Sequence, residues 1–104
     1  MPENYNGLTA EQTELLSCLA EECAEVIKEV TKILRHGLQI RHLTMGDWNN
    51  QAKLSEEVGQ LFYIMDLCET AKIVDSETAF KGFEAKKQDL RKWSHHIDWS
   101  TKHE

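Results

Sequence analysis

The feature that most restricts the fold is a long run of apolar residues at helical spacing near the start of the chain. Between positions 10 and 36 they recur at Leu15, Leu16, Leu19, Cys23, Val26, Ile27, Val30, Ile33 and Leu34, which is the period of an amphipathic α-helix. The 104 residues include one Pro and five Gly, so little turn material separates such segments. The sequence therefore predicts an all-α protein built from a few long helices.

Local signals predict the bounds of the first helix. Thr9 followed by Gln12 has the form of a capping box, so the helix is expected to begin near Ala10. It is expected to run to about His36, with Gly37 as its C-cap. The following segment, LQIRHLTMGDWNN (38–50), is too polar and irregular for a helix and is predicted to be a loop.

Two further helices are predicted after this loop. Asn49 or Asn50 can cap the second helix, which continues through LFYIMDL (61–67). That run is apolar nearly all round, which indicates burial on more than one side. Ser76 is expected to cap the third helix, whose apolar stripe consists of Ala79, Phe80, Phe83, Leu90 and Trp93.

The expected architecture is an antiparallel helical bundle in a single domain over residues 1–94, followed by a C-terminal tail at 95–104. The tail has no clear period and is expected to be mobile or to lie on a partner. Three helices of this size have limited surface to bury alone. We therefore expect the bundle to be completed by oligomerisation, as a homodimer or a homotetramer.

Composition excludes several classes of protein. The net charge of −6 argues against binding a nucleic-acid polymer, which needs basic excess. No window approaches the roughly 20 apolar residues of a membrane span, and MPENYNGLTAEQ does not resemble a secretory signal. The three cysteines lie in apolar helical patterns, which favours packed, reduced thiols and a cytoplasmic location. Zinc binding is disfavoured because CxxC is absent.

One acidic spacing occurs twice, in EECAE (21–25) and in EEVGQ (56–60). At about 100° per residue, Glu25, Glu29 and Glu22 fall within about 100° of Glu21 on the first helix, opposite the apolar positions. Glu56, Gln60 and Glu57 repeat these angles on the second helix. If the helices pack antiparallel, the two acidic arcs are expected to face each other across a groove.

Crowded carboxylates need a cation between them, because like charges repel strongly at reduced dielectric. Carboxylate oxygens favour Mg²⁺, with Mn²⁺ also possible. A di-iron site is disfavoured because no His has a Glu three positions before it. The spacing alone also fits a solvated acidic face, and this second interpretation stays open at this stage.

The segments EECAEVIKEVTKILRHG, NN and LSEEVGQLFYIMDL resemble the MazG-like members of the all-α nucleoside triphosphate pyrophosphohydrolases. That family has EExxE on one helix and ExxD on the next, and the resemblance covers roughly residues 12–94. It implies metal-dependent hydrolysis of a (deoxy)nucleoside triphosphate to the monophosphate and pyrophosphate, with Mg²⁺ as cofactor.

The resemblance assigns roles to individual residues. Glu22, Glu25 and Glu57 match the catalytic, metal-binding acids, and Glu21 is a further candidate ligand. Gln60 stands where the family has Asp, so it is expected to be a weak, neutral ligand or to act through a water. This departure motivates an alternative function, a catalytically silent nucleotide- or metal-binding module or a structural helical bundle.

Several basic and aromatic residues are candidates for substrate binding. Lysine and arginine side chains on the first and third helices could contact phosphates, and an aromatic ring and an amide at the start of the second could read a base. These candidates are Lys28, Arg35, Lys81, Lys86, Trp48 and Asn50. Most such lysines simply solvate a helix face, which is the competing interpretation.

Overall fold

The computed structural model describes residues 5–39 and 49–102. Within them the chain forms three α-helices and one short 3₁₀ helix, with no strand. The helices are α1 (Ala10–His36), α2 (Asn50–Thr70) and α3 (Ser76–Trp93), and the 3₁₀ helix is η1 (Trp99–Thr101). The all-α prediction is confirmed. Among the described residues, no helix is long and apolar enough to cross a membrane.

The predicted capping box forms at the start of α1. Gln12 N donates to Thr9 Oγ1 at 3.1 Å, and Thr9 N donates to Gln12 Oε1 at 2.9 Å. At the other end Gly37 donates its N–H to the carbonyl oxygen of Ile33 at 2.7 Å. Both predicted bounds of this helix are confirmed. They could be predicted from the sequence because the capping signals lie within one turn of each end.

The caps of the other two helices differ slightly in how well the sequence predicted them. Asn49 caps α2 as expected, since its Oδ1 accepts from Ala52 N at 2.8 Å. The cap of α3 is Asp75, one residue before the predicted Ser76, and its Oδ2 accepts from Thr78 N at 2.9 Å. Hydrogen bonds from the Thr78 side chain and backbone lower the pKa of Asp75 below its ordinary value.

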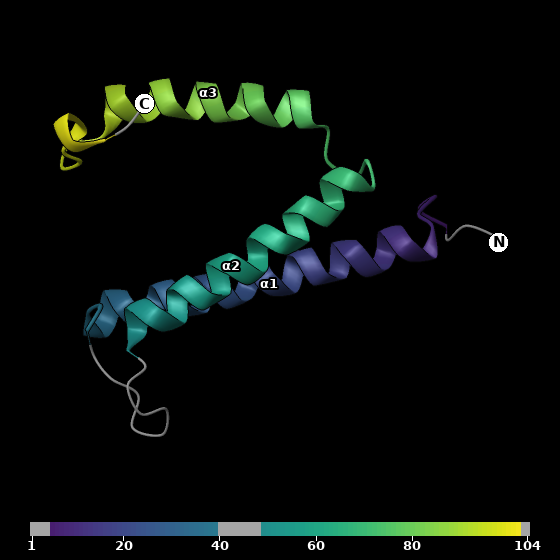
Figure 1. Cartoon of the computed structure of the whole chain (residues 1–104), viewed down its shortest axis with the longest axis horizontal. Helices are drawn as coiled ribbons and strands as arrows, with labels where there is room; N and C mark the ends of the chain where they lie inside the picture. The colour runs from purple at the N-terminus through teal and green to yellow at the C-terminus, as the bar shows by residue number, and fades with distance from the viewer. Residues whose placement is uncertain (1–4, 40–48, 103–104) are drawn as a thin grey trace. The chain divides into compact units, whose positions relative to one another are not determined.

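The chain divides into two compact units, Met1–Val74 and Asp75–Glu104. In the first unit α1 and α2 pack side by side and run in opposite directions, as Figure 1 shows. The predicted antiparallel pair is therefore confirmed. The predicted domain over 1–94 with a tail at 95–104 stays a prediction.

An amide network joins the ends of α1 and α2 next to the connecting loop. Asn50 Nδ2 donates to the Gly37 carbonyl oxygen at 3.0 Å, and Gln51 N donates to the Leu38 carbonyl oxygen at 2.9 Å. Gln39 accepts from Asn49 and donates to Gln51. These bonds fix where α2 starts relative to the end of α1. Most of the predicted loop (residues 40–48) lies outside the described residues.

The face of α1 that packs on α2 consists of half-buried apolar residues with glutamates among them. Its members are Leu15, Leu19, Glu22, Val26, Glu29 and Ile33, and the matching face of α2 contains Asn50, Leu54, Glu57, Leu61, Ile64 and Cys68. Both sets recur at intervals of three and four residues, as expected for a packed helix pair. Among the described residues, Cys68 is the one fully buried apolar side chain.

The predicted all-round burial of α2 is not reached within a single chain, since Phe62 and Tyr63 are 60% and 63% exposed. Cys23, expected to be packed, is an exposed free thiol. In the second unit, the α3 stripe is also open to solvent, with Phe83 and Trp93 66% and 67% exposed. The part of the tail that the structure describes folds back on its own unit, where Trp99 Nε1 donates to Ser94 Oγ at 3.0 Å.

Candidate functional site

The predicted acids of α1 lie at different depths. Glu21 is exposed, whereas Glu22 and Glu25 are half-buried. The Oε2 atom of Glu22 is buried and has no hydrogen-bond partner. The expectation that the acidic arc lies opposite the apolar face was wrong, because Glu22 belongs to the face that packs on α2. It follows the same spacing as the leucines at positions 15 and 19, so packing carries it inward.

Glu29, which the sequence placed in the acidic arc without assigning it a role, is the most deeply buried acid in the described part of the chain. Its side chain is 1% exposed, and neither carboxylate oxygen has a hydrogen-bond partner. Lys32 Nζ lies 3.7 Å from Glu29 Oε1, which is an ion-pair distance but too long for a hydrogen bond. The spacing from Glu22 to Glu29, two helical turns, was the sequence signal that could have identified it.

On α2 the acidic motif is split between the packed face and the surface. Glu57 is 5% exposed and faces α1, whereas Glu56 is half-buried and Gln60 is exposed. At about 100° per residue, Gln60 lies about 60° around the helix from Glu57. On α2, Glu57 is therefore the one acid buried on the face that packs against α1. Gln60, which departs from the family pattern, is exposed to solvent.

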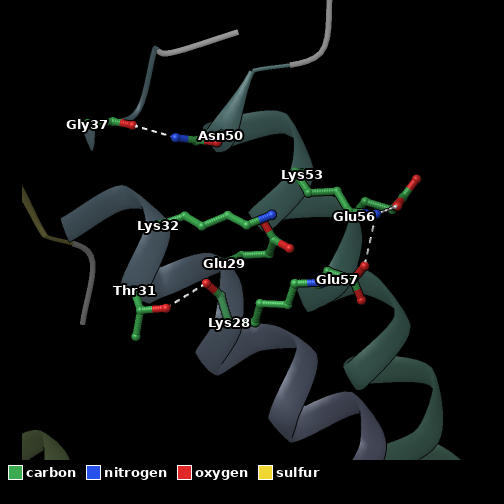
Figure 2. A network of polar contacts seen from close by, with 9 residues as sticks. All are labelled: Lys28, Glu29, Thr31, Lys32, Gly37, Asn50, Lys53, Glu56 and Glu57. Carbon is green, nitrogen blue, oxygen red and sulfur yellow. Dashed lines mark hydrogen bonds and ion pairs between the residues drawn. The ribbon is translucent and has the colours of Figure 1, made fainter. Parts of the chain in front are cut away.

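Lys53 balances the charge of this motif, and the sequence reasoning missed it. Its Nζ lies 3.0 Å from Glu56 Oε1 and 3.1 Å from Glu57 Oε1 (Figure 2). Hydrogen bonds to Glu56 and Glu57 raise the pKa of Lys53, and the bond to Glu56 has the larger effect. The signal was present, because a lysine three and four residues before two glutamates lies next to both on a helix.

The basic and amide residues predicted to bind substrate are scattered. Lys28 and Arg35 are exposed on α1, and Lys81 and Lys86 are exposed on α3 in the second unit. Trp48 lies outside the described residues. Asn50 is 4% exposed and holds the α1–α2 connection through Gly37, so its amide already has a structural role. Substrate binding by these residues stays a prediction.

Figure 2 shows how acids and lysines are arranged between the two helices: Glu29 on α1 and Glu57 on α2, with Lys28, Lys32 and Lys53 around them. Within residues 5–39 and 49–102, no three carboxylate, imidazole or thiol side chains are grouped closely enough to hold a metal ion. Glu29 and Glu57 thus lie inside the helix pair, and Lys32 and Lys53 lie at ion-pair distance from them.

The acidic helix pair lies within a segment that matches a known protein family. A family model described as the MazG nucleotide pyrophosphohydrolase domain matches residues 10–97, most of the chain. The chain belongs to the MazG family. The resemblance drawn from EECAE and EEVGQ is therefore confirmed at the level of the family. No curated protein and no solved structure matches the chain.

The MazG resemblance implies a magnesium ion, and the donor chemistry of the helix pair fits one. Three buried carboxylate oxygens have no hydrogen-bond partner, Oε2 of Glu22 and both oxygens of Glu29. Hard oxygen ligands of this kind are those that Mg²⁺ and Mn²⁺ prefer. Buried carboxylate oxygens without hydrogen bonds are costly, and the Lys32 ion pair at 3.7 Å reaches one oxygen of Glu29, so a divalent ion would relieve part of this cost.

Proposed function

We propose that this MazG protein is a metal-dependent pyrophosphohydrolase that converts (deoxy)nucleoside triphosphates to monophosphates and pyrophosphate. The observation that carries the proposal is the set of unpartnered carboxylate oxygens inside the helix pair that bears the family motif. A purely structural helix pair would gain stability from apolar residues at these positions. Retaining acids there is expected of a site that binds a cation.

In this proposal the metal is held by acids of the two matched motifs, for which Glu22, Glu25 and Glu57 are the candidate ligands. When bound, Mg²⁺ or Mn²⁺ would neutralise the charge of the phosphates and favour attack by water at the α-phosphorus. The exposed cations Lys28 and Arg35 lie on the same helix as two of these acids and can contact phosphate oxygens as they approach. Gln60 carries no negative charge and cannot act as a base, so any general base is one of the acids.

The test is pyrophosphate release from a panel of NTPs and dNTPs, first with Mg²⁺ and then with Mn²⁺. The native protein is compared with Gln60→Asp, which restores the family acid, and with Glu57→Gln. Turnover by the native protein that Glu57→Gln abolishes would establish the enzyme and its site. Unchanged turnover in Glu57→Gln would exclude this site, and no turnover in the native protein or in Gln60→Asp would exclude the activity.

A second candidate function is a catalytically silent module that binds nucleotide and metal. The specific observation in its favour is Gln60, a neutral and exposed residue in the position of the family Asp. Calorimetry with Mg²⁺ and a non-hydrolysable triphosphate separates the two functions. Binding without turnover, with turnover gained in Gln60→Asp, would support the silent module, whereas an absence of binding would favour a structural bundle.

We also propose that the protein self-associates in the cytoplasm as a homodimer or homotetramer. Cys68 is the one fully buried apolar side chain in the described part of the chain, which is far less core than a stable domain of this length needs. Large apolar side chains on both units are open to solvent, among them Ile27, Leu34, Phe62, Phe83 and Trp93. Sedimentation equilibrium tests this, and a monomer at all concentrations would refute it.

A further inference from the structure

The hydrogen bond from Asn50 to Gly37 sets the register of α2 against α1. From this bond, Glu57 lies seven residues along α2 and Glu29 lies eight residues back along α1. At about 1.5 Å of rise per residue, these acids are about 10.5 Å and 12 Å from the linked ends. They are therefore almost level across the pair, consistent with their positions in Figure 2.

The same register separates Glu57 from the other acids of α1. Glu25 is about 18 Å and Glu22 about 22 Å from the Gly37 end, by the same rise per residue. Both are therefore further along the helix than Glu57, by more than one turn. Of the acids that EECAEVIKE contributes, Glu29 is the one whose axial position matches that of the buried acid on α2.

Glu29 also has the burial and the unmet hydrogen bonding expected of a metal ligand. It is 1% exposed, it faces α2, and both of its oxygens lack a hydrogen bond. A lysine ion pair at 3.7 Å offsets only part of the cost of burying the charge, because a buried carboxylate needs close hydrogen bonds or a metal to replace its lost hydration. By contrast, Gln60 is neutral and exposed.

We propose that Glu29 is a metal ligand that replaces the acid missing at Gln60. It would bind a hard divalent cation together with Glu57 across the helix pair, with Glu25 one turn away on α1. Lys32 and Lys53 then serve as the counter-ions of these carboxylates in the metal-free protein and are displaced when the cation enters. This inference rests on the proposed function, because it concerns the same metal site.

The test is a titration of the 104-residue protein with Mn²⁺ alone, in which electron paramagnetic resonance measures the concentration of the free ion. Glu29→Gln should weaken binding by roughly ten- to hundredfold, the range typical of lost metal-site interactions. Glu14→Gln is the matched control, since it removes the same charge from an exposed position on α1 and should leave binding unchanged. Adding Gln60→Asp to Glu29→Gln should recover much of the lost affinity.

Circular dichroism of each variant without metal checks that α1 and α2 are intact. If Glu29→Gln does not fold, Glu29→Asp provides the same test, because it keeps the charge but withdraws the carboxylate by one methylene and should also weaken binding. Native Mn²⁺ affinity in the folded Glu29 variant, or equal losses in Glu29→Gln and Glu14→Gln, would overturn the proposal.

The outcome is independent of whether the protein is an enzyme. Mn²⁺ binding that depends on Glu29 without pyrophosphate release would support the ligand assignment and contradict the proposed function. Pyrophosphate release that persists in Glu29→Gln, with unchanged Mn²⁺ affinity, would support the function and refute the ligand assignment. Absence of Mn²⁺ binding in the native protein would also refute the assignment.

Discussion

Lys53 Nζ lies 3.1 Å from Glu57 Oε1, so the buried acid of the second motif is paired with a cation from its own helix. The same amine lies 3.0 Å from Glu56 Oε1, which places one positive charge between two carboxylates. A divalent cation that binds Glu57 has to displace this amine or share the carboxylate with it. Lys53 is therefore expected to oppose metal binding in the free protein.

Replacing Lys53 with Gln should strengthen Mn²⁺ binding. The change removes the competing charge but keeps a polar side chain of similar length. A partly exposed ion pair contributes about 0.2–1 kcal/mol, so the gain in affinity should be about 1.4- to fivefold. Lys102→Gln, an exposed position, is the charge-matched control. Weaker or unchanged Mn²⁺ binding in Lys53→Gln would show that the amine does not compete with the metal.

The ion pairs of Lys53 also predict how stability depends on pH. Its pKa is raised above the ordinary value of 10.5 by the hydrogen bonds to Glu56 and Glu57. A raised pKa means that the folded state binds the proton more tightly, so this contribution is fully present below 10.5 and is lost as pH rises through the folded-state pKa.

The measurement is the free energy of unfolding by urea for the native protein and Lys53→Gln, at pH values from neutral to above 10.5. The native protein should be the more stable of the two at neutral pH, and the difference should shrink as the amine loses its proton. A difference that stays constant across this range would mean that the paired charge is not its source.

The sequence predicted the ends of the helices better than the way they face each other. The capping box at Thr9 and the cap at Asn49 depend on residues within one turn, so local pattern is sufficient. Asp75 and Ser76 are adjacent and both are good caps, so only the folded backbone distinguishes them. The seven-residue spacing from Glu22 to Glu29 indicates that both acids share one helix face, but the depth of Glu29 also depends on α2 packing over that face, which the pattern of α1 alone does not report.

Gly37 should be difficult to replace for reasons of backbone conformation alone. Its φ of 91° and ψ of 168° lie in a region that is essentially restricted to glycine. A Cβ atom there would meet nothing within 4 Å, so strain and not a clash determines the cost. Gly37→Ala should lower the free energy of unfolding by about 1–3 kcal/mol.

Gly59→Ala is the matched comparison for this substitution. Gly59 lies inside α2, a Cβ there also meets nothing within 4 Å, and its φ is not positive. Because alanine favours a helix interior over glycine, Gly59→Ala should raise the free energy of unfolding by about 0.5–1 kcal/mol. Urea denaturation measures both, and equal effects of the two substitutions would contradict the conformational argument.

Asn50→Ala should reduce both stability and metal affinity, because its amide holds the register that brings Glu29 level with Glu57. The side chain is 4% exposed and donates to the Gly37 carbonyl at 3.0 Å, so leaving that carbonyl unpaired should cost about 1–3 kcal/mol. Thr9→Ala, which removes the cap on Gln12 N at the far end of α1, should cost about 1 kcal/mol but leave Mn²⁺ affinity unchanged. Urea denaturation and Mn²⁺ titration of both variants separate loss of stability from loss of register. Equal Mn²⁺ affinity in Thr9→Ala and Asn50→Ala would show that the Asn50 bond does not position the acids.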